Sequence, residues 1–306
     1  MTIHVIAPGP FTTVQDLGRN GYASAGAPPS GAMDPFALRA ANRLAGNDDS
    51  AAALEITLQG PTLRFDADAT IALTGAPIDA DLDGTPVPTL ETTNIANGST
   101  LRLQQCARGV RAYLAVHGGI QVPVILGSRS TLASASLGGL EGRALQEGDT
   151  LPIGATTGTL AMRGWRLQDY PNEVRVIPGP QTDAFTDRGR DSLFAQEFRV
   201  SPRSDRVGVR LDGEPIELAG TADIDPEGVV TGAIQIPGDG HPIVLGPDRP
   251  VTGGYAKIVT VIAADLGVIA QARPGGSLRF VEVTLDQARA AWRQREGELA
   301  SIEDLA

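Results

Sequence analysis

Short strand-like runs, each bounded by turn-forming residues, dominate the sequence and favour a mainly β fold. Residues 69–75 and 100–105 read ATIALTG and TLRLQQ, and similar runs recur along the chain. Such runs are rich in β-branched residues and end at Gly, Pro, Asn or Asp, as strands joined by tight turns do. Helical patterns are few: one runs from an N-cap at Asp34 to Gly46, one covers ADLGVIAQA, and one covers TLDQARAAWRQREGELA with Thr284 as its cap. We therefore expect a mainly β protein with a few short helices.

The length of 306 residues is enough for two domains with sizeable cores. A stretch of small residues at 154–165, GATTGTLAMRGW, follows the strand-like end LPIG and precedes the strand-like run VRVIPGP. We expect a boundary there, with lobes of about 1–160 and 161–306. The N-terminus lacks the pattern of a secretion signal, and no apolar run approaches the roughly 18 residues of a membrane span, so we expect a cytoplasmic protein.

The formal net charge of −11 argues against binding to nucleic acid or to an anionic membrane surface, since both require a basic face. The basic residues are arginines except for one lysine, Lys257. A Walker-type phosphate loop requires Gly-Lys-Ser/Thr, whereas Lys257 lies in YAKIV, so this ATP-binding signature is absent. Planar guanidinium groups are therefore the expected ligands for anions.

Several common catalytic chemistries find no support in the sequence. The three histidines are isolated, so no zinc-binding spacing occurs. The single cysteine, Cys106, excludes an intrachain disulfide, and its place in LRLQQCARG indicates a structural residue at a strand end. No GxSxG elbow occurs, and Ser128 and Ser130 of GSRST have no recognisable base, so we expect neither a metal site nor a serine hydrolase triad.

Charged residues concentrate instead in glycine-rich loops, which read TVQDLGRNGY, GSRST, GGLEGRALQEGD, SDRVGVRLDG and, between strand-like runs, GPDRPVTGGY. Loops on a rigid scaffold commonly carry function. An arginine there can bind a carboxylate or phosphate while an aspartate orients water or takes a proton. The alternative is structural, an arginine fork that ties one loop to a neighbouring carboxylate.

These loops also carry a family resemblance. The segments TVQDLGRNGYASAGAPPSGAMDPFALRAANRLAGND, YLAVHGGIQVPVILGSRST, SDRVGVRLDG and AIQIPGDGHPIVLGPDRPVTGGYAKIVTVI resemble the KipA family, also called allophanate hydrolase subunit 2 or urea amidolyase related protein. The family includes the C component of bacterial 5-oxoprolinase, and the resemblance runs from about Val14 to Phe280. It implies two cyclophilin-like β-barrel lobes that together make one carboxyltransferase-type unit.

The resemblance also implies partners and leaves three functions open. In the first, the chain joins a KipI-like B component and a LamB/YcsF-like A component to hydrolyse 5-oxo-L-proline to L-glutamate at the expense of ATP. In the second, it is the acceptor half of a biotin-dependent carboxyltransferase that acts on urea or a similar amide. In the third, it regulates a KipI-like partner without catalysis. A separate chain of this type fits 5-oxoprolinase best, with ATP bound by the A or B component or at a shared interface, and with biotin used only under the second reading.

Candidate catalytic residues follow from the matched motifs. We expect Asp248 and Gln235 to orient substrate or water, with Asp205 as a third catalytic candidate. Glycine permits close approach of the backbone, so Gly253 and Gly254 would bring N–H groups to a substrate oxygen. The family pattern at this place is commonly DRQTTGGY or DAQTTGGY, and the present sequence has Pro and Val where that pattern has Gln and Thr.

Candidate substrate-binding residues come from the same motifs. Arg206 or Arg129 would hold the carboxylate of 5-oxoproline through a bidentate fork, the alternative for Arg206 being a salt bridge to Asp205. The remaining substrate-binding candidates are Tyr255 and Lys257, which match the family pattern, together with Asp34 and Asn42. Asp34 has a structural alternative as a helix cap, and Asn42 as the anchor of a neighbouring loop. We expect the other polar residues of the first loop to shape a turn: Gln15, Asp16 and Arg19.

Overall fold

The computed structural model describes residues 1–156, 160–165 and 170–304, and it confirms the mainly β architecture. The chain forms two compact units. The first comprises Met1–Asn20, Ser30–Gln168 and Gly297–Ala306, and the second comprises Gly21–Pro29 and Asp169–Glu296. The segment in which we expected a boundary, 154–165, includes residues 157–159, which lie outside the described residues.

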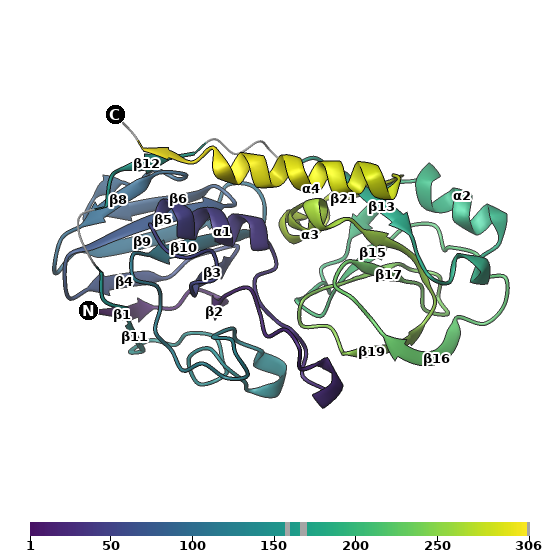
Figure 1. The fold of residues 1–306 in the computed structure, drawn as a ribbon, viewed down its shortest axis with the longest axis horizontal. Coiled ribbons are helices and arrows are strands. Elements are labelled where there is room, and N and C mark those ends of the chain that lie inside the picture. The colour runs from purple at the N-terminus through teal and green to yellow at the C-terminus, as the bar shows by residue number, and fades with distance from the viewer. Residues whose placement is uncertain (157–159, 166–169, 305–306) are drawn as a thin grey trace. The chain divides into compact units, whose positions relative to one another are not determined.

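Two antiparallel sheets build the first unit (Figure 1). The six-stranded sheet has the order β11 (Thr150–Pro152), β1 (Thr2–Ala7), β4 (Thr62–Phe65), β9 (Thr100–Cys106), β6 (Ile78–Leu82) and β7 (Thr85–Pro86). The five-stranded sheet has the order β2 (Thr12–Gln15), β3 (Ala53–Thr57), β10 (Arg111–Val116), β5 (Ala69–Gly75) and β8 (Thr92–Ile95). Side chains alternate along each strand, so one face of each sheet supplies the common core, which includes Leu63, Phe65, Leu54 and Leu114.

Helix α1 (Pro35–Leu44) covers the other face of the five-stranded sheet (Figure 1). Its apolar residues pack with Tyr113 and Ala115 of β10, so every residue of β10 is buried. The side chain of Asp34 accepts a hydrogen bond from the N–H of Ala37, and proline occupies the first helical position. This confirms the helix start predicted from the sequence, because both features fix the first turn.

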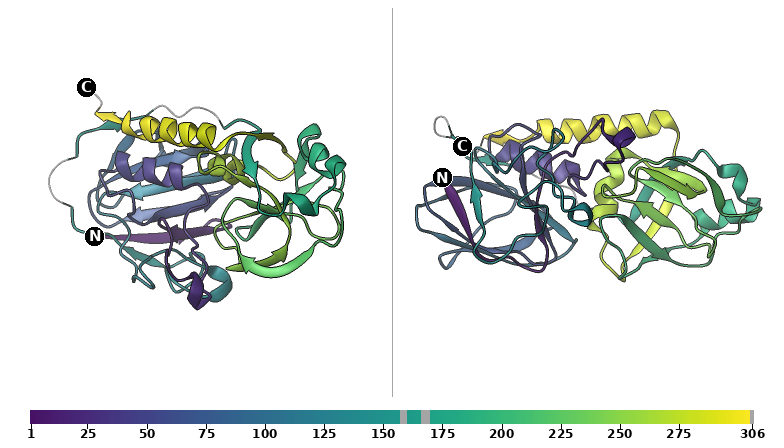
Figure 2. Two further views of the ribbon diagram at one scale, coloured as in Figure 1. Left: turned by 45° about the vertical axis from the view of Figure 1, so that its right-hand side comes forward. Right: turned by 90° about the horizontal axis from the view of Figure 1, so that it is seen from below.

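A closed barrel of seven strands forms the second unit (Figure 2). Around the barrel the order is β13 (Glu173–Pro178), β20 (Lys257–Val261), β17 (Ala233–Gln235), β18 (Ile243–Leu245), β15 (Gly208–Asp212), β14 (Phe198–Val200) and β21 (Ser277–Glu282). Strands β13 and β21 are parallel, and the other neighbours are antiparallel. A separate two-stranded ribbon pairs β16 (Asp223–Gly228) with β19 (Thr252–Tyr255).

The remaining elements are helices and short pieces. The helices are α2 (Asp187–Ala195), α3 (Leu266–Gln271) and α4 (Leu285–Ala300); the 3₁₀ turns are Ala23–Ala25, Ala133–Ala135, Thr182–Ala184 and Ala263–Asp265; and β12 (Arg163–Gly164) pairs with β22 (Glu303–Asp304). Thr284 and Gln287 exchange side-chain to backbone hydrogen bonds of 2.8 and 3.2 Å, a reciprocal cap that confirms the predicted start of α4. Within the described residues, every helix is too short or too polar to cross a bilayer.

Candidate functional site

Arg206 and Asp248 form a buried ion pair in the second unit. The guanidinium Nε and Nη2 lie 2.8 and 3.0 Å from the two carboxylate oxygens, and the side chains are only 9% and 8% exposed. The N–H of Asp248 also donates to the carbonyl of Arg206, at 3.1 Å. The pair therefore fastens the loop before β19 to the loop before β15, and its bidentate geometry occupies both oxygens of Asp248.

The alternative role of Arg206, a structural salt bridge, is the one that the structure shows, but the predicted partner was wrong. We expected Asp205, the preceding residue, yet the carboxylate that Arg206 contacts belongs to Asp248. Asp205 is exposed, and its Oδ1 accepts from the N–H groups of Val207 and Gly208 at 2.8 and 3.0 Å. Asp205 thus shapes the turn into β15, because an aspartate readily bonds to the backbone two residues ahead.

Lys257 holds a second charge cluster at the start of β20. Its Nζ lies 2.9 Å from Oε1 of Glu227, and the amide of Gln181 donates to the same oxygen at 2.8 Å. The lysine side chain is 4% exposed and the glutamate side chain is 45% exposed. Hydrogen bonds from Lys257 and then from Gln181 lower the pKa of Glu227. A buried ammonium group is thus neutralised by a carboxylate that water, or another anion, can reach. We call Lys257, Glu227, Gln181 and Gln235 the Lys257 cluster.

Gln235 lies beside Lys257, because the two residues are partners in the register of β17 and β20. A Cβ added at Gly253 would lie 2.9 Å from Val229, which it would crowd, and 3.4 Å from Oε1 of Gln235, which it would touch. Among the described residues, the half-buried amide of Gln235 has no hydrogen-bond partner. The amide is therefore free to bind a ligand near Gly253. Gly254 and the partly exposed Tyr255 follow on β19.

The other candidate residues belong to the first unit, and each has a structural contact. Asn42 donates to the carbonyl of Ala51 at 2.7 Å and accepts from Asn47, so it anchors the loop after α1. Arg129 donates from Nε to the carbonyl of Val122 at 2.9 Å and from Nη2 to Gln121 at 2.8 Å. Asp34 caps α1 and is fully buried.

Asp16 is the centre of a polar network in the first unit. Its carboxylate accepts from the hydroxyls of Ser128 and Ser130, from the N–H of Arg129 and from the N–H of Gly18. The buried guanidinium of Arg19 donates to the carbonyl of Ser130. The segment TVQDLGR and the segment GSRST are therefore tied together, and the serines of GSRST serve this connection.

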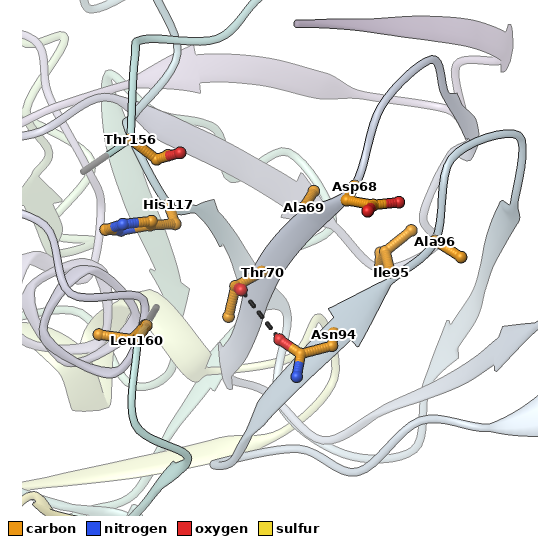
Figure 3. Close-up of a pocket in the computed structure, with 9 residues that line it drawn as sticks. All are labelled: Asp68, Ala69, Thr70, Asn94, Ile95, Ala96, His117, Thr156 and Leu160. Carbon is orange, nitrogen blue, oxygen red and sulfur yellow. Dashed lines mark hydrogen bonds between the residues drawn. The ribbon is translucent and has the colours of Figure 1, made fainter. Parts of the chain in front are cut away.

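A cavity of about 550 Å³ opens in the first unit (Figure 3). Its lining includes Asp68, Thr70, Asn94 and His117, and the hydroxyl of Thr70 donates to Asn94 at 2.9 Å. The ring Nδ1 of His117 lies 2.8 Å from the carbonyl oxygen of Ala45. None of our candidate residues lines this cavity. Across the described ranges, no group of three or more His, Cys, Asp or Glu side chains is placed to hold a metal ion.

Sequence reasoning missed three residues that the structure makes prominent. Glu227 neutralises the ammonium group of Lys257, and Gln181 accepts a hydrogen bond from the N–H of Lys257. They lie 30 and 76 residues before Lys257, and neither stands in a recognisable motif. Arg249 follows Asp248 in GPDRPVTGGY, and its Nε and Nη1 are buried without a hydrogen-bond partner in the described part of the chain. The motif draws attention to that loop, but burial of this guanidinium depends on tertiary packing.

The chain resembles known proteins over its whole length. It is 39% identical to the C component of the 5-oxoprolinase of Escherichia coli, over 99% of this chain and 97% of that protein. It is 33% identical to "Urea amidolyase" of Lachancea kluyveri, over 98% of this chain but 18% of that protein. The solved structure of Kluyveromyces lactis urea carboxylase superposes with a TM-score of 0.90 at 32% identity and covers 99% of this chain, which spans 29% of that larger chain.

The profile of one family, "Carboxyltransferase domain, subdomain A and B", matches residues 25–282. That range contains the closed barrel, the Arg206–Asp248 pair and the Lys257 cluster. The chain therefore belongs to this carboxyltransferase-domain family, whose members include the 5-oxoprolinase C component and a domain of the urea amidolyases.

Proposed function

We propose that this chain is the C component of an ATP-dependent 5-oxoprolinase, which hydrolyses 5-oxo-L-proline to L-glutamate together with a KipI-like B component and a LamB/YcsF-like A component. The observation that carries the proposal is the degree of identity: this chain is 39% identical to the Escherichia coli C component and 33% identical to a urea amidolyase. The higher identity thus favours the 5-oxoprolinase over the urea amidolyases as the enzyme to which this chain belongs.

The reaction needs ATP because an unstrained lactam resists attack by water. The γ-phosphoryl group of ATP would pass to the lactam oxygen with release of ADP, and water would add to the activated ring carbon. The C–N bond would then break as the nitrogen takes up a proton, and hydrolysis of the resulting acyl phosphate would release inorganic phosphate and glutamate. We assign ATP to the A or B component, or to an interface, because the only lysine of this chain does not stand in a phosphate loop.

The Lys257 cluster supplies groups suited to the lactam. Lys257 can place positive charge beside an oxygen on which negative charge develops, and the buried setting strengthens that interaction. The free amide of Gln235 can bond to the lactam N–H or carbonyl next to Gly253. The ion pair of Asp248 with Arg206 leaves this aspartate a positioning role, since both of its carboxylate oxygens accept hydrogen bonds from the guanidinium.

A second candidate function is carboxyl transfer to urea or a similar amide. It is favoured by the family match and by the TM-score of 0.90 to urea carboxylase. In that case the same cluster would hold the acceptor amide, and biotin would come from a separate component.

The two functions are separated by assaying the complex of this chain with its co-encoded partners on both substrates. We expect ATP-dependent glutamate from 5-oxo-L-proline and no carboxylation of urea when carboxybiotin is supplied. Replacing Lys257 by Met should lower glutamate formation about 10²-fold, whereas Arg210→Gln, at an exposed residue of β15, should not change it. Carboxylated urea without glutamate would instead establish the second function.

A further inference from the structure

Arg249 is half-buried, and its guanidinium group lacks a counter-ion among the described residues. Its Nε and Nη1 have essentially no solvent-exposed surface, and neither has a hydrogen-bond partner in the described part of the chain. Burial lowers the pKa of Arg249. Arginine nevertheless stays charged at any physiological pH, so the folded protein keeps a partly desolvated cation with two nitrogens whose hydrogen bonds are not satisfied.

The loop around Arg249 is well fixed. The preceding residue, Asp248, is held by the bidentate pair with Arg206, and the N–H of Arg249 donates to the carbonyl of Gly246 at 3.3 Å. Pro250 follows and restricts the backbone, and the carbonyl of Val251 accepts from Val229 at 3.2 Å. The guanidinium is therefore presented from a preorganised loop, which reduces the entropy lost when a ligand binds.

The arginines that the sequence proposed for the substrate carboxylate have other partners. Arg206 is paired with Asp248, and Arg129 donates to Val122 and Gln121 in the first unit. Arg249 differs because its Nε and Nη1 have no hydrogen-bond partner among the described residues, so the guanidinium still has donors to offer to a carboxylate. The role we predicted for Arg206 or Arg129 is thus better matched by the neighbour of Asp248.

We propose that Arg249 binds the carboxylate of the substrate and makes the site selective for a small carboxylic acid over the corresponding neutral amide. The inference rests on the proposed function, in which that acid is 5-oxo-L-proline. The Lys257 cluster would then act on the lactam, while Arg249 would recognise the acid group.

The test compares Arg249→Gln with the wild-type complex, and Arg210→Gln serves as the matched control because it removes an exposed arginine of the same unit. The substrates are 5-oxo-L-proline and 5-oxo-L-prolinamide, which lacks the negative charge. In Arg249→Gln we expect the KM for 5-oxo-L-proline to rise roughly ten- to hundredfold, the range of one charge-assisted hydrogen bond or bidentate pair. The KM for the amide should stay within about twofold in both variants.

The variant should fold normally, because no ion pair of Arg249 is lost, and its melting temperature provides the check. If the wild-type complex forms glutamate and Arg249→Gln keeps the wild-type ratio of the two KM values, the inference is wrong while the proposed function stands. If the wild-type complex forms no glutamate and calorimetry detects no binding of 5-oxo-L-proline, the proposed function and the inference both fail. Calorimetric binding of the acid that weakens in Arg249→Gln would support the inference even without turnover.

Discussion

Two ion pairs of the second unit differ in how much of each pair water can reach. Arg206 and Asp248 shield each other from water, so their geometry is fixed and their role is to hold two loops together. Lys257 has a partner, Glu227, that is 45% exposed, so another anion can compete for the ammonium group. The first arrangement is typical of a structural pair, and the second is typical of a site that exchanges its partner for a ligand.

Removal of Asp248 should therefore destabilise the fold. Asp248→Ala leaves Arg206 buried without its carboxylate, and we expect the free energy of unfolding to fall by ~3–5 kcal/mol. The double variant Arg206→Met, Asp248→Ala should recover part of that loss, because it removes the uncompensated charge. Urea denaturation measures both effects. Asp225→Ala, at an exposed carboxylate of β16, is the control and should stay within about 0.5 kcal/mol of wild type; an equally small effect of Asp248→Ala would contradict a structural pair.

For single residues, the sequence identifies which polar side chains are important better than it identifies which residues they contact. The motif GPDRPVTGGY points to Asp248, but its partner Arg206 lies 42 residues away, and the adjacent Asp205 was the simpler choice. Likewise, Arg249 cannot be recognised from the sequence, because the burial of its nitrogens arises only when distant strands close the barrel.

The helices that the sequence predicts correctly are those with a local start signal, such as a capping residue or an N-terminal proline. Helix α1 has a cap and a proline at its start, and α4 has a reciprocal cap at Thr284. Helix α2 was missed because TDRGRDSLFA contains a glycine and few apolar residues, although Thr186 accepts from the N–H of Gly189 as its cap. Strand β16, DIDPEG, has neither apolar alternation nor a buried face, and it exists because β19 pairs with it.

The end of α1 offers a test of pH dependence. Asp49 accepts from Arg43 at 2.6 Å and from Arg39 at 2.9 Å, and the hydrogen bond from Arg43 is the main cause that lowers the pKa of Asp49 below its ordinary value of 3.8. A lowered pKa means that the folded state favours the charged carboxylate. Its contribution to stability is therefore complete above about pH 4 and is lost as the pH falls through the lower pKa of the folded state.

We accordingly expect Asp49→Asn to lower the melting temperature at pH 7 and to make a smaller difference at pH 3. Thermal unfolding of both proteins between pH 3 and pH 7 measures the gap. Asp191→Asn is a suitable control, since Asp191 is an exposed carboxylate of α2. A gap that widens toward pH 3 would contradict the assigned direction of the pKa.

For the whole molecule, the strand-rich pattern predicts the class of fold, and the ordered motifs predict the family. Which segments belong to each unit is harder to predict from the sequence. Segment 21–29 groups with the second unit, and the residues from Gly297 onward group with the first. Both groupings arise from long-range packing rather than from any shift in composition. The acidic net charge of −11 agrees with partners other than nucleic acid.

As a whole, the molecule is proposed to act as one component of a larger enzyme, the ATP-dependent 5-oxoprolinase. The most direct measurement is glutamate formed from 5-oxo-L-proline and ATP by this chain with its co-encoded A and B partners, with each component omitted in turn. We expect the complete mixture to form glutamate and to release one phosphate per glutamate. We expect no glutamate when this chain is left out. Undiminished glutamate formation without this chain, or none from an assembled complete complex, would contradict this proposal.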